Sequence, residues 1–514
     1  MVHAIRNIVI VGGGTAGWLT AGIIAARHRA RIPHSFNVTL VESPNTPILG
    51  VGEGTWPTLR STLKKIGVSE TDFIRECDAA FKQGACFARW STGQEDDAYY
   101  HPLVLPEGFA RVNLVPHWLI NNRGQSFCDA VCPQGRLCED GLAPKSITTP
   151  EYEGAANYAY HLDAGKFAPF LQRHCCEKLG MTHVLADVRE VLFAENGDIR
   201  AIDTEQAGEI EGDLFIDCTG FRSLLLGGAL GVPFQDCNDV LFCDTALAVQ
   251  LPYESETSPV ACHTISTAQT AGWIWDIGLP SRRGTGHVYS SSHISQDEAE
   301  SQLRAYLGPA SKDLPVRKIK FRSGRRETFW KRNCVAIGLA AGFLEPLESS
   351  AIVLVELSAK MIAEQMPACR EVMDIIAKRF NEAKRYRWDR AVDFLKLHYA
   401  LTKRTDSAFW RDNVLPATIP DRLQDLLHLW RYQSPWFHDE FDRLDEVFPA
   451  ASYQYVLYGM GFRTEVAPET LAQEAAVAMQ AMRENATQTE RLRTTLPRHR
   501  DLLRKIQEFG LQPV

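Results

Sequence analysis

The chain has 514 residues, of which 45% are apolar and 23% are charged, and its formal net charge is −8. This is the composition of a globular protein, and the length suffices for about three domain-sized units. The negative net charge and the lack of a basic stripe with interleaved aromatic residues exclude a nucleic-acid-binding protein. No apolar run approaches the ~20 residues of a membrane span. We therefore expect neither nucleic-acid nor membrane partners.

The thirteen cysteines are an odd number without a disulfide framework, and they include the adjacent pair Cys175 and Cys176. This usage favours reduced thiols in the cytoplasm. Cys128, Cys132 and Cys138 fall in one loop region and raise the question of a metal site. They lack CxxC spacing and a second matching half, so we expect free thiols and no metal.

The first half of the chain alternates strands and helices. Residues 7–11 (Asn-Ile-Val-Ile-Val) are typical of a buried parallel strand, 15–29 of a helix and 37–42 of a second strand. Together they form a βαβ unit. Further elements are expected as a helix at 57–67, a helix within 164–179, strands at 182–187 and 213–217, a hairpin turning at 196–197, and antiparallel strands over 240–290.

Two regions depart from this alternation. Residues 92–150 are polar and rich in Pro, Gly, Asn and aromatics, and they are too long for a plain connection, so we interpret them as a pocket-forming insertion. After residue 337 helices are expected at 350–365, 371–387, 421–432 and 469–510, interrupted by Pro367 and Pro497. The expected organisation is an α/β module over 1–355, which carries the insertion, and a helical module over 356–514.

The glycine pattern of residues 11–17 (Val-Gly-Gly-Gly-Thr-Ala-Gly) follows the first strand and opens the first helix. Gly12 permits the tight turn, Gly14 lets the backbone approach a pyrophosphate, and Gly17 lets helix and strand pack closely. Glu42 ends the second strand, where a carboxylate can bond a ribose hydroxyl. The pattern predicts a Rossmann-type dinucleotide site.

FAD suits this site better than NAD. A single fingerprint disfavours an enzyme with separate nicotinamide and flavin halves, and two more Gly-rich strand ends occur at 217–221 and 336–342. Backbone amides at such turns bind anions and carbonyl oxygens. Reducing equivalents must then come from another protein.

Trp273 and Trp275 lie two residues apart in the segment Gly-Trp-Ile-Trp-Asp-Ile, so a strand would place both indoles on one face. Such a pair suits either a sheet core or a wall beside a flat cofactor.

Five motifs occur in order and resemble those of the flavin-dependent tryptophan halogenases: residues 12–18, 50–57, 81–84, 272–277 and 338–349. The resemblance implies an α/β fold in which a single-fingerprint FAD module is joined by an antiparallel sheet and a mainly helical C-terminal substrate module. It also implies halogenation of an electron-rich aromatic by reduced FAD, dioxygen and halide through hypohalous acid. A separate flavin reductase would supply the reduced FAD by free diffusion. The protein would be a monomer or a homodimer.

The resemblance also implies roles for individual residues. Lys82 corresponds to the catalytic lysine that delivers the halogen, and Glu348 to the acidic group that orients hypohalous acid and accepts the ring proton. Halide is expected at the amides of Ser350 and Ala351, and Trp273 and Trp275 are expected beside the flavin. The residues expected to bind FAD are Gly12, Gly14, Thr15, Ala16, Gly17, Glu42, Gly50, Val188, Leu339 and Ile352.

Substrate residues are expected at His101, Leu103, Tyr453 and Tyr455. The two tyrosines are separated by Gln454 rather than adjacent, and Leu103 replaces an expected aromatic, so an indole or another electron-rich arene fits better than free tryptophan. Ala351 adds a methyl group beside the halide amides and favours bromide over chloride.

Two alternatives stay open at this point: a flavin-dependent aromatic hydroxylase and a non-catalytic flavin-binding protein. A hydroxylase has no use for a lysine away from the flavin, so Lys82 and Glu348 discriminate between them. The sequence leaves open the natural substrate, the regiochemistry, the halide preference and the oligomeric state.

Overall fold

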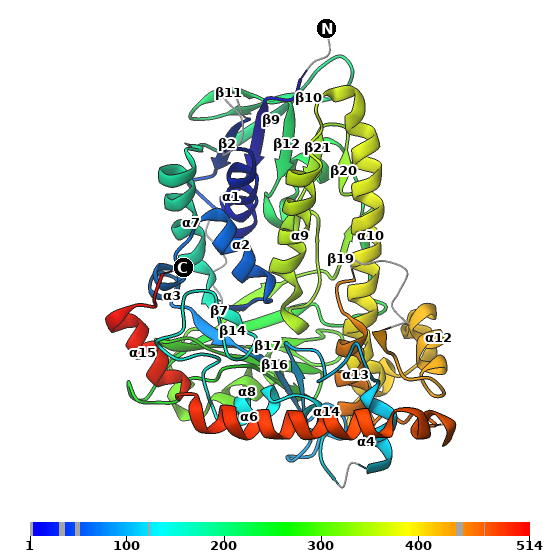
Figure 1. Cartoon of the computed structure of the whole chain (residues 1–514). Helices are drawn as coiled ribbons and strands as arrows, with labels where there is room; N and C mark the ends of the chain where they lie inside the picture. Colours follow the sequence, from blue (N-terminus) through cyan, green and yellow to red (C-terminus); the bar gives the residue numbers. More distant parts are fainter. Residues whose placement is uncertain are drawn as a thin grey trace. The chain divides into compact units, whose positions relative to one another are not determined.

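The structure is a computed structural model (Figure 1). It describes residues 4–29, 36–46, 52–121, 124–437, 446–466 and 468–513, without the side chains of 468–470, 472 and 473. The chain divides into two compact units, each built from three separate segments. Unit 1 comprises Met1–Ala79, Leu162–Cys237 and Arg322–Trp388, and unit 2 comprises Ala80–His161, Asn238–Phe321 and Asp389–Val514.

Unit 1 is built on a six-stranded sheet in the order β20-β21-β12-β1-β2-β8. The strands, in that order, are Trp330–Lys331, Cys334–Ala336, Leu214–Asp217, Asn7–Val11, Asn37–Glu42 and Thr182–Leu185. β1 pairs in parallel with both β2 and β12, and its last four residues are buried, as an apolar run without alternation predicts. The predicted βαβ unit is confirmed with the bounds expected for β1, α1 and β2.

The helices of unit 1 pack around α1 (Thr15–Arg29), which contacts α7 (Ala164–Leu179), α9 (Ser350–Glu364) and α2 (Thr58–Ile66). α7 begins where the Asp163 side chain accepts a hydrogen bond from the Gly165 amide, so Pro169 lies inside the helix and does not open it. The predicted hairpin at 196–197 is confirmed: β9 (Val188–Phe193) pairs antiparallel with β10 (Ile199–Thr204).

Unit 2 is built on a seven-stranded sheet in the order β18-β14-β17-β16-β15-β5-β6. The strands, in that order, are Arg317–Lys320, Thr245–Pro252, Arg282–Tyr289, Gly272–Gly278, Thr264–Gln269, Gly84–Ala88 and Ala98–Pro102. All neighbours are antiparallel except β5 and β15, which confirms the antiparallel strands predicted over 240–290. Helix α8 (Gln296–Leu307) covers one part of this sheet by packing Leu303 and Leu307 on Leu247 and Ile274.

The region 92–150 has regular structure. It supplies the edge strand β6 and three short helices, α4 (Leu114–Asn121), α5 (Phe127–Val131) and α6 (Gln134–Glu139). All three contact the long helix α14 (Pro468–Thr495), which runs along them in Figure 1. Short helices are marginal alone, so the packing against α14 explains why the sequence of this region did not show them.

The C-terminal helices are present, with α10 (Arg370–Ala400) longer than expected and α12 (Asp421–Leu429) shorter. The chain breaks between α14 and α15 (His499–Phe509), at the predicted proline, Pro497. Neither unit begins or ends at residue 355, where the sequence predicts a boundary. Strands from distant segments share each sheet, and α10 contributes residues to both units.

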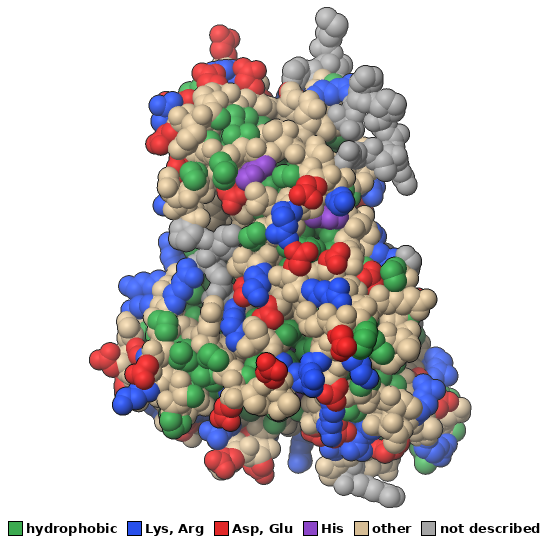
Figure 2. Space-filling view, turned by 90° about the vertical axis from the view of Figure 1, so that its left-hand side faces the viewer, with side chains coloured by type: hydrophobic (Ala, Val, Ile, Leu, Met, Phe, Trp, Pro, Cys, Tyr) green, Lys and Arg blue, Asp and Glu red, His purple; other side chains and the backbone are tan. Residues whose placement is uncertain are grey.

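Within the described residues, no helix is both long enough and apolar enough to cross a membrane. On the face drawn in Figure 2, the coloured Lys and Arg side chains are interspersed with Asp and Glu and gather into no single basic stripe.

Glu356 provides a test of packing in unit 1. It lies on α9, is 4% exposed, and accepts a hydrogen bond of 2.9 Å from the Thr58 hydroxyl on α2. Burial raises the pKa of Glu356 to about 7. A carboxyl group whose pKa is raised in the folded state costs stability as pH rises from its unfolded pKa, near 4.5, through 7.

We expect Glu356→Gln to gain stability relative to wild type by up to about 3 kcal/mol between pH 5 and pH 8. Urea unfolding at both pH values measures this, with the exposed Glu382→Gln as the control. A pH-independent difference between Glu356→Gln and wild type would contradict burial of an ionisable carboxyl at this position.

Candidate active site

The glycine turn of unit 1 is shaped by close backbone approaches. Gly12 has φ +117°, and a Cβ there would lie 2.2 Å from the carbonyl oxygen of Cys218 on the next strand end. A Cβ on Gly17 would lie 1.9 Å from the Gly12 carbonyl oxygen. A Cβ on Gly14 would meet no atom within 4 Å. Gly12 and Gly17 are therefore needed by the fold, whereas Gly14 leaves its backbone open to a ligand.

A carboxylate lies over this turn. A Cβ on Gly13 would be 2.0 Å from the Glu42 carboxyl carbon, and Glu42 Oε2 is 3.0 Å from Nε2 of His183 on β8. The turn leads directly into α1, whose first residues are Thr15 and Ala16. Backbone amides at a helix N-terminus can bind the phosphates of FAD, and a neighbouring carboxylate can accept a hydrogen bond from its ribose hydroxyl.

The remaining cofactor candidates lie at other loops of unit 1. The Ala186 amide donates to the Glu42 carbonyl oxygen at 2.9 Å, which places the chain leading to Val188 beside the second strand. Gly338, which precedes Leu339, has φ +66° and would bring a Cβ to 2.7 Å from the Ala16 Cβ. Ile352 is buried on α9. Gly50 lies outside the described residues.

The turn before α9 is strained. Glu348 and Ser349 have φ values of +64° and +55°, a conformation that costs non-glycine residues about 1–3 kcal/mol each. The indole Nε1 of Trp56 holds the turn by donating to the Glu348 carbonyl oxygen at 2.8 Å. The Ser349 side chain does not cap the helix, so the first amides of α9, at Ser350 and Ala351, have no cap from it and lie at the positive end of the helix dipole. This arrangement suits a small anion.

Lys82 lies in unit 2 and is 3% exposed. It is the last residue of β4 (Ala80–Lys82), which pairs antiparallel with β7 (Ala159–Asp163). Backbone hydrogen bonds hold the residues on either side: Phe81 donates to His499 Nε2 at 3.1 Å, and Gln83 donates to the Cys262 carbonyl oxygen at 2.7 Å. Lysine is seldom buried to this extent unless its ammonium group has a partner.

Two buried histidines accompany this lysine. His161 lies on the same face of the β4–β7 pair as Lys82, diagonally across the ladder, and its Nε2 is 2.9 Å from the Thr264 hydroxyl. Burial, followed by the positive charge of Lys82, lowers the pKa of His161 well below its ordinary value.

His499 is neutral with a fixed tautomer. Its Nε2 accepts from Phe81, so Nδ1 carries the proton and donates to the Val260 carbonyl oxygen at 3.0 Å. Burial lowers its pKa, which keeps it in this form.

The expected substrate residues of unit 2 fall into two groups. His101 on β6 is bonded to the Ser452 hydroxyl at 2.9 Å, and its ring centre lies 6.2 Å from that of Tyr455 on α13 (Ala450–Gly459). Tyr453 points elsewhere, between Phe394 and Trp430, because residues two apart on a helix face opposite sides. Leu103 follows β6, and its amide donates to Gln134 Oε1 at 2.9 Å.

The tryptophan pair occupies β16, as expected. Trp273 is 1% exposed, and its ring lies 6.3 Å from Trp90 in an aromatic cluster. Trp275 packs over Gly286, where a Cβ would be 2.1 Å from the indole. These contacts account for both tryptophans as sheet packing within unit 2, and their expected place beside a flavin stays a prediction.

The comparisons with known proteins agree over nearly the whole chain. The family model described as tryptophan halogenase matches residues 7–476. The solved tryptophan halogenase of Shewanella frigidimarina is 48% identical with a TM-score of 0.97, covering 99% of both chains. Tryptophan 6-halogenase SttH of Streptomyces toxytricini is 35% identical over 88% of this chain and 89% of its own length. Tryptophan 7-halogenase RebH of Lentzea aerocolonigenes is 33% identical over 84% and 83%.

The fold and the glycine turn define a flavin-dependent oxidoreductase. The family match is more specific: the chain belongs to the tryptophan halogenase family. The predicted α/β fold and the predicted family are both confirmed.

Three residues of interest were not predicted. His161 and His499 are single histidines far from Lys82 in sequence, and no local pattern marks them. Glu53 lies in the motif at 50–57, and burial raises its pKa to about 7. Its position as a carboxyl group inside a family motif is the sequence signal that marks Glu53.

The bond from Phe81 to His499 can be tested by substitution. His499→Phe keeps an aromatic ring but leaves the buried Phe81 amide and Val260 carbonyl without their partner, so we expect the free energy of unfolding to fall by about 1–3 kcal/mol. Urea unfolding measures this, and the exposed His428→Phe serves as the control. Equal stability of the two variants would show that the bond contributes nothing.

Proposed function

We propose that the protein halogenates an electron-rich arene, an indole derivative, and that a separate flavin reductase supplies its reduced FAD. The observation that carries this proposal is that Lys82 is buried and that the backbone amides of both its neighbours, Phe81 and Gln83, are hydrogen-bonded. Bound reduced FAD, with dioxygen, supplies the oxidising equivalents that turn halide into hypohalous acid.

Unit 1 residues hold the cofactor and the halide in this proposal. The glycine turn and Glu42 bind the phosphates and ribose, since Gly14 is open and Glu42 covers Gly13. Halide rests against the amides of Ser350 and Ala351, which follow the strained turn at the start of α9 and are not capped by the Ser349 side chain.

Lys82 and Glu348 carry the two halves of the substitution. The Lys82 ammonium group hydrogen-bonds the oxygen of hypohalous acid, and this polarises the oxygen–halogen bond as the ring carbon attacks the halogen. The oxygen leaves as water after taking a proton from Lys82. The Glu348 carboxylate accepts the proton that the ring carbon loses. The neutral forms of His161 and His499 add no competing positive charge around Lys82.

The hydroxylase alternative is not favoured. A hydroxylase transfers oxygen directly from the flavin side, so a buried lysine with fixed flanking amides has no role there, and the family match is to halogenases.

The side-chain contacts of α13 bear on the class of substrate. Tyr453 is enclosed by Phe394 and Trp430, and the Gln454 side chain donates to the Pro435 carbonyl oxygen at 2.6 Å. The Gln454 amide is therefore not available to an amino-acid head group, and we assign the indole ring to the side of His101 and Tyr455. The relatives' names specify tryptophan; here an indole without a charged head group fits better.

Replacing Lys82 separates flavin oxidation from halogenation. With reduced FAD, dioxygen, bromide and indole, we expect Lys82→Ala to oxidise flavin at the wild-type rate and to lose at least ~100-fold in halogenated product. Liquid chromatography with mass spectrometry measures the product, and oxygen consumption measures flavin oxidation. The exposed Lys64→Ala is the control. An undiminished product yield in Lys82→Ala would refute the role of Lys82.

Halide preference depends on Ala351. In a mixture of equal chloride and bromide, we expect brominated product to dominate for the wild type, because the extra methyl group excludes water from the ion and bromide is the less strongly hydrated of the two. Ala351→Gly should shift the product ratio toward chloride. Mass spectrometry resolves both products by isotope pattern. Chlorinated product alone from the wild type would sink the hypothesis.

A further inference from the structure

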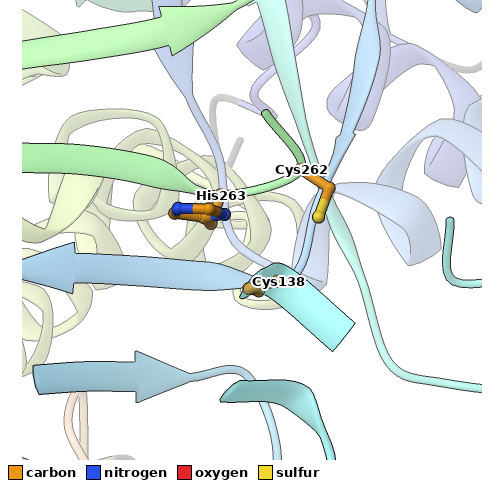
Figure 3. Close-up of side chains that lie close together, drawn as sticks. All are labelled: Cys138, Cys262 and His263. Carbon is orange, nitrogen blue, oxygen red and sulfur yellow. The ribbon is translucent and has the colours of Figure 1, made fainter. Parts of the chain in front are cut away.

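Unit 2 contains a cluster of two thiols and an imidazole that the halogenation does not use. Cys138 lies on α6, and Cys262 and His263 immediately precede β15. One ligand atom from each of the three lies within 4.8 Å of the others, and all three residues are buried. Figure 3 shows the Cys262 sulfur and the His263 ring on one side and Cys138 facing them from the neighbouring helix.

The imidazole of His263 is a buried polar group that the protein does not fully satisfy. The side chain is 8% exposed, and its Nδ1 has no hydrogen-bond partner within the part of the chain that the structure describes. An unsatisfied buried polar atom costs about 1–3 kcal/mol unless a partner completes it. The ring is held in place by an edge contact with Tyr100, with ring centres 5.6 Å apart.

We propose that Cys138, Cys262 and His263 bind a thiophilic divalent cation, zinc, with a water completing a tetrahedron. Thiolate and imidazole are ligands that zinc prefers, whereas magnesium and calcium require oxygen. Two thiolates cancel the charge of the cation, so the occupied site is neutral and suited to burial. Zinc itself has no redox chemistry.

Occupancy would fix the strand that carries the catalytic lysine. The Cys262 carbonyl oxygen accepts the hydrogen bond from Gln83, the residue after Lys82, at 2.7 Å. Metal ligation by the Cys262 side chain therefore anchors the acceptor of that bond. This consequence rests on the proposed function of Lys82, whereas metal binding itself does not.

The test is the metal content of the full chain, produced without a histidine tag in zinc-containing medium and purified without chelators. We expect inductively coupled plasma mass spectrometry to find about one zinc per chain in the wild type, and background levels in Cys262→Ser and His263→Gln. Cys243→Ser, an equally buried cysteine of the same unit, should keep the zinc. Cobalt in place of zinc should give thiolate charge-transfer absorption that His263→Gln weakens.

Three results would overturn the site: a wild type that holds no zinc and takes none from a chromophoric chelator, zinc content unchanged in Cys262→Ser and His263→Gln, or a Cys138–Cys262 disulfide in protein purified under reductant. The cobalt spectrum of the wild type decides the matter even if a variant fails to fold. A variant that loses zinc but still halogenates would show that the proposed function does not depend on this site. A protein that binds zinc but does not halogenate would contradict the proposed function and leave the zinc site standing.

Discussion

The backbone around Lys82 is the constraint on which the functional half of the structure depends. Phe81 is bonded to His499, which lies 418 positions later in the chain, and Gln83 is bonded to Cys262. β4 is also paired with β7. A flexible lysine becomes a positioned reagent only when its backbone is fixed, because its long side chain otherwise loses rotamer entropy at each reaction. The burial of His161 and His499 in neutral form follows from the same enclosure.

In unit 1 the proposed binding groups are positioned by backbone conformation. Unit 1 uses backbone rather than side chains: glycines that let Gly12 approach Cys218 and Gly17 approach Gly12, and the strained pair Glu348 and Ser349 before α9. Amides presented in this way can bind anions such as phosphate or halide through the backbone. The residues proposed to bind cofactor and halide thus belong to one unit, and Lys82 and the proposed substrate residues belong to the other.

Local patterns predicted much of this. The bounds of β1, α1 and β2, the antiparallel strands around Trp273, and the break at Pro497 follow from periodicity and proline chemistry. The family motifs drew attention to Lys82 and Glu348, whose catalytic roles stay predictions. Contacts between distant segments could not be predicted: the helices of 92–150 depend on α14, His499 reaches Phe81 from the C-terminal helix, and Cys138 meets Cys262 rather than its sequence neighbours Cys128 and Cys132. Tyr453 and Tyr455 were grouped by spacing, but the helix that carries them separates them.

In the proposed reaction dioxygen oxidises the halide, and no oxygen atom is incorporated into the aromatic ring. The most direct measurement is the mass spectrum of the aromatic product formed from indole, bromide, reduced FAD and isotopically heavy dioxygen. The account predicts a product that carries bromine and no heavy oxygen, with the label found in water. A hydroxylated product that carries the heavy oxygen would contradict it and identify a hydroxylase on this fold.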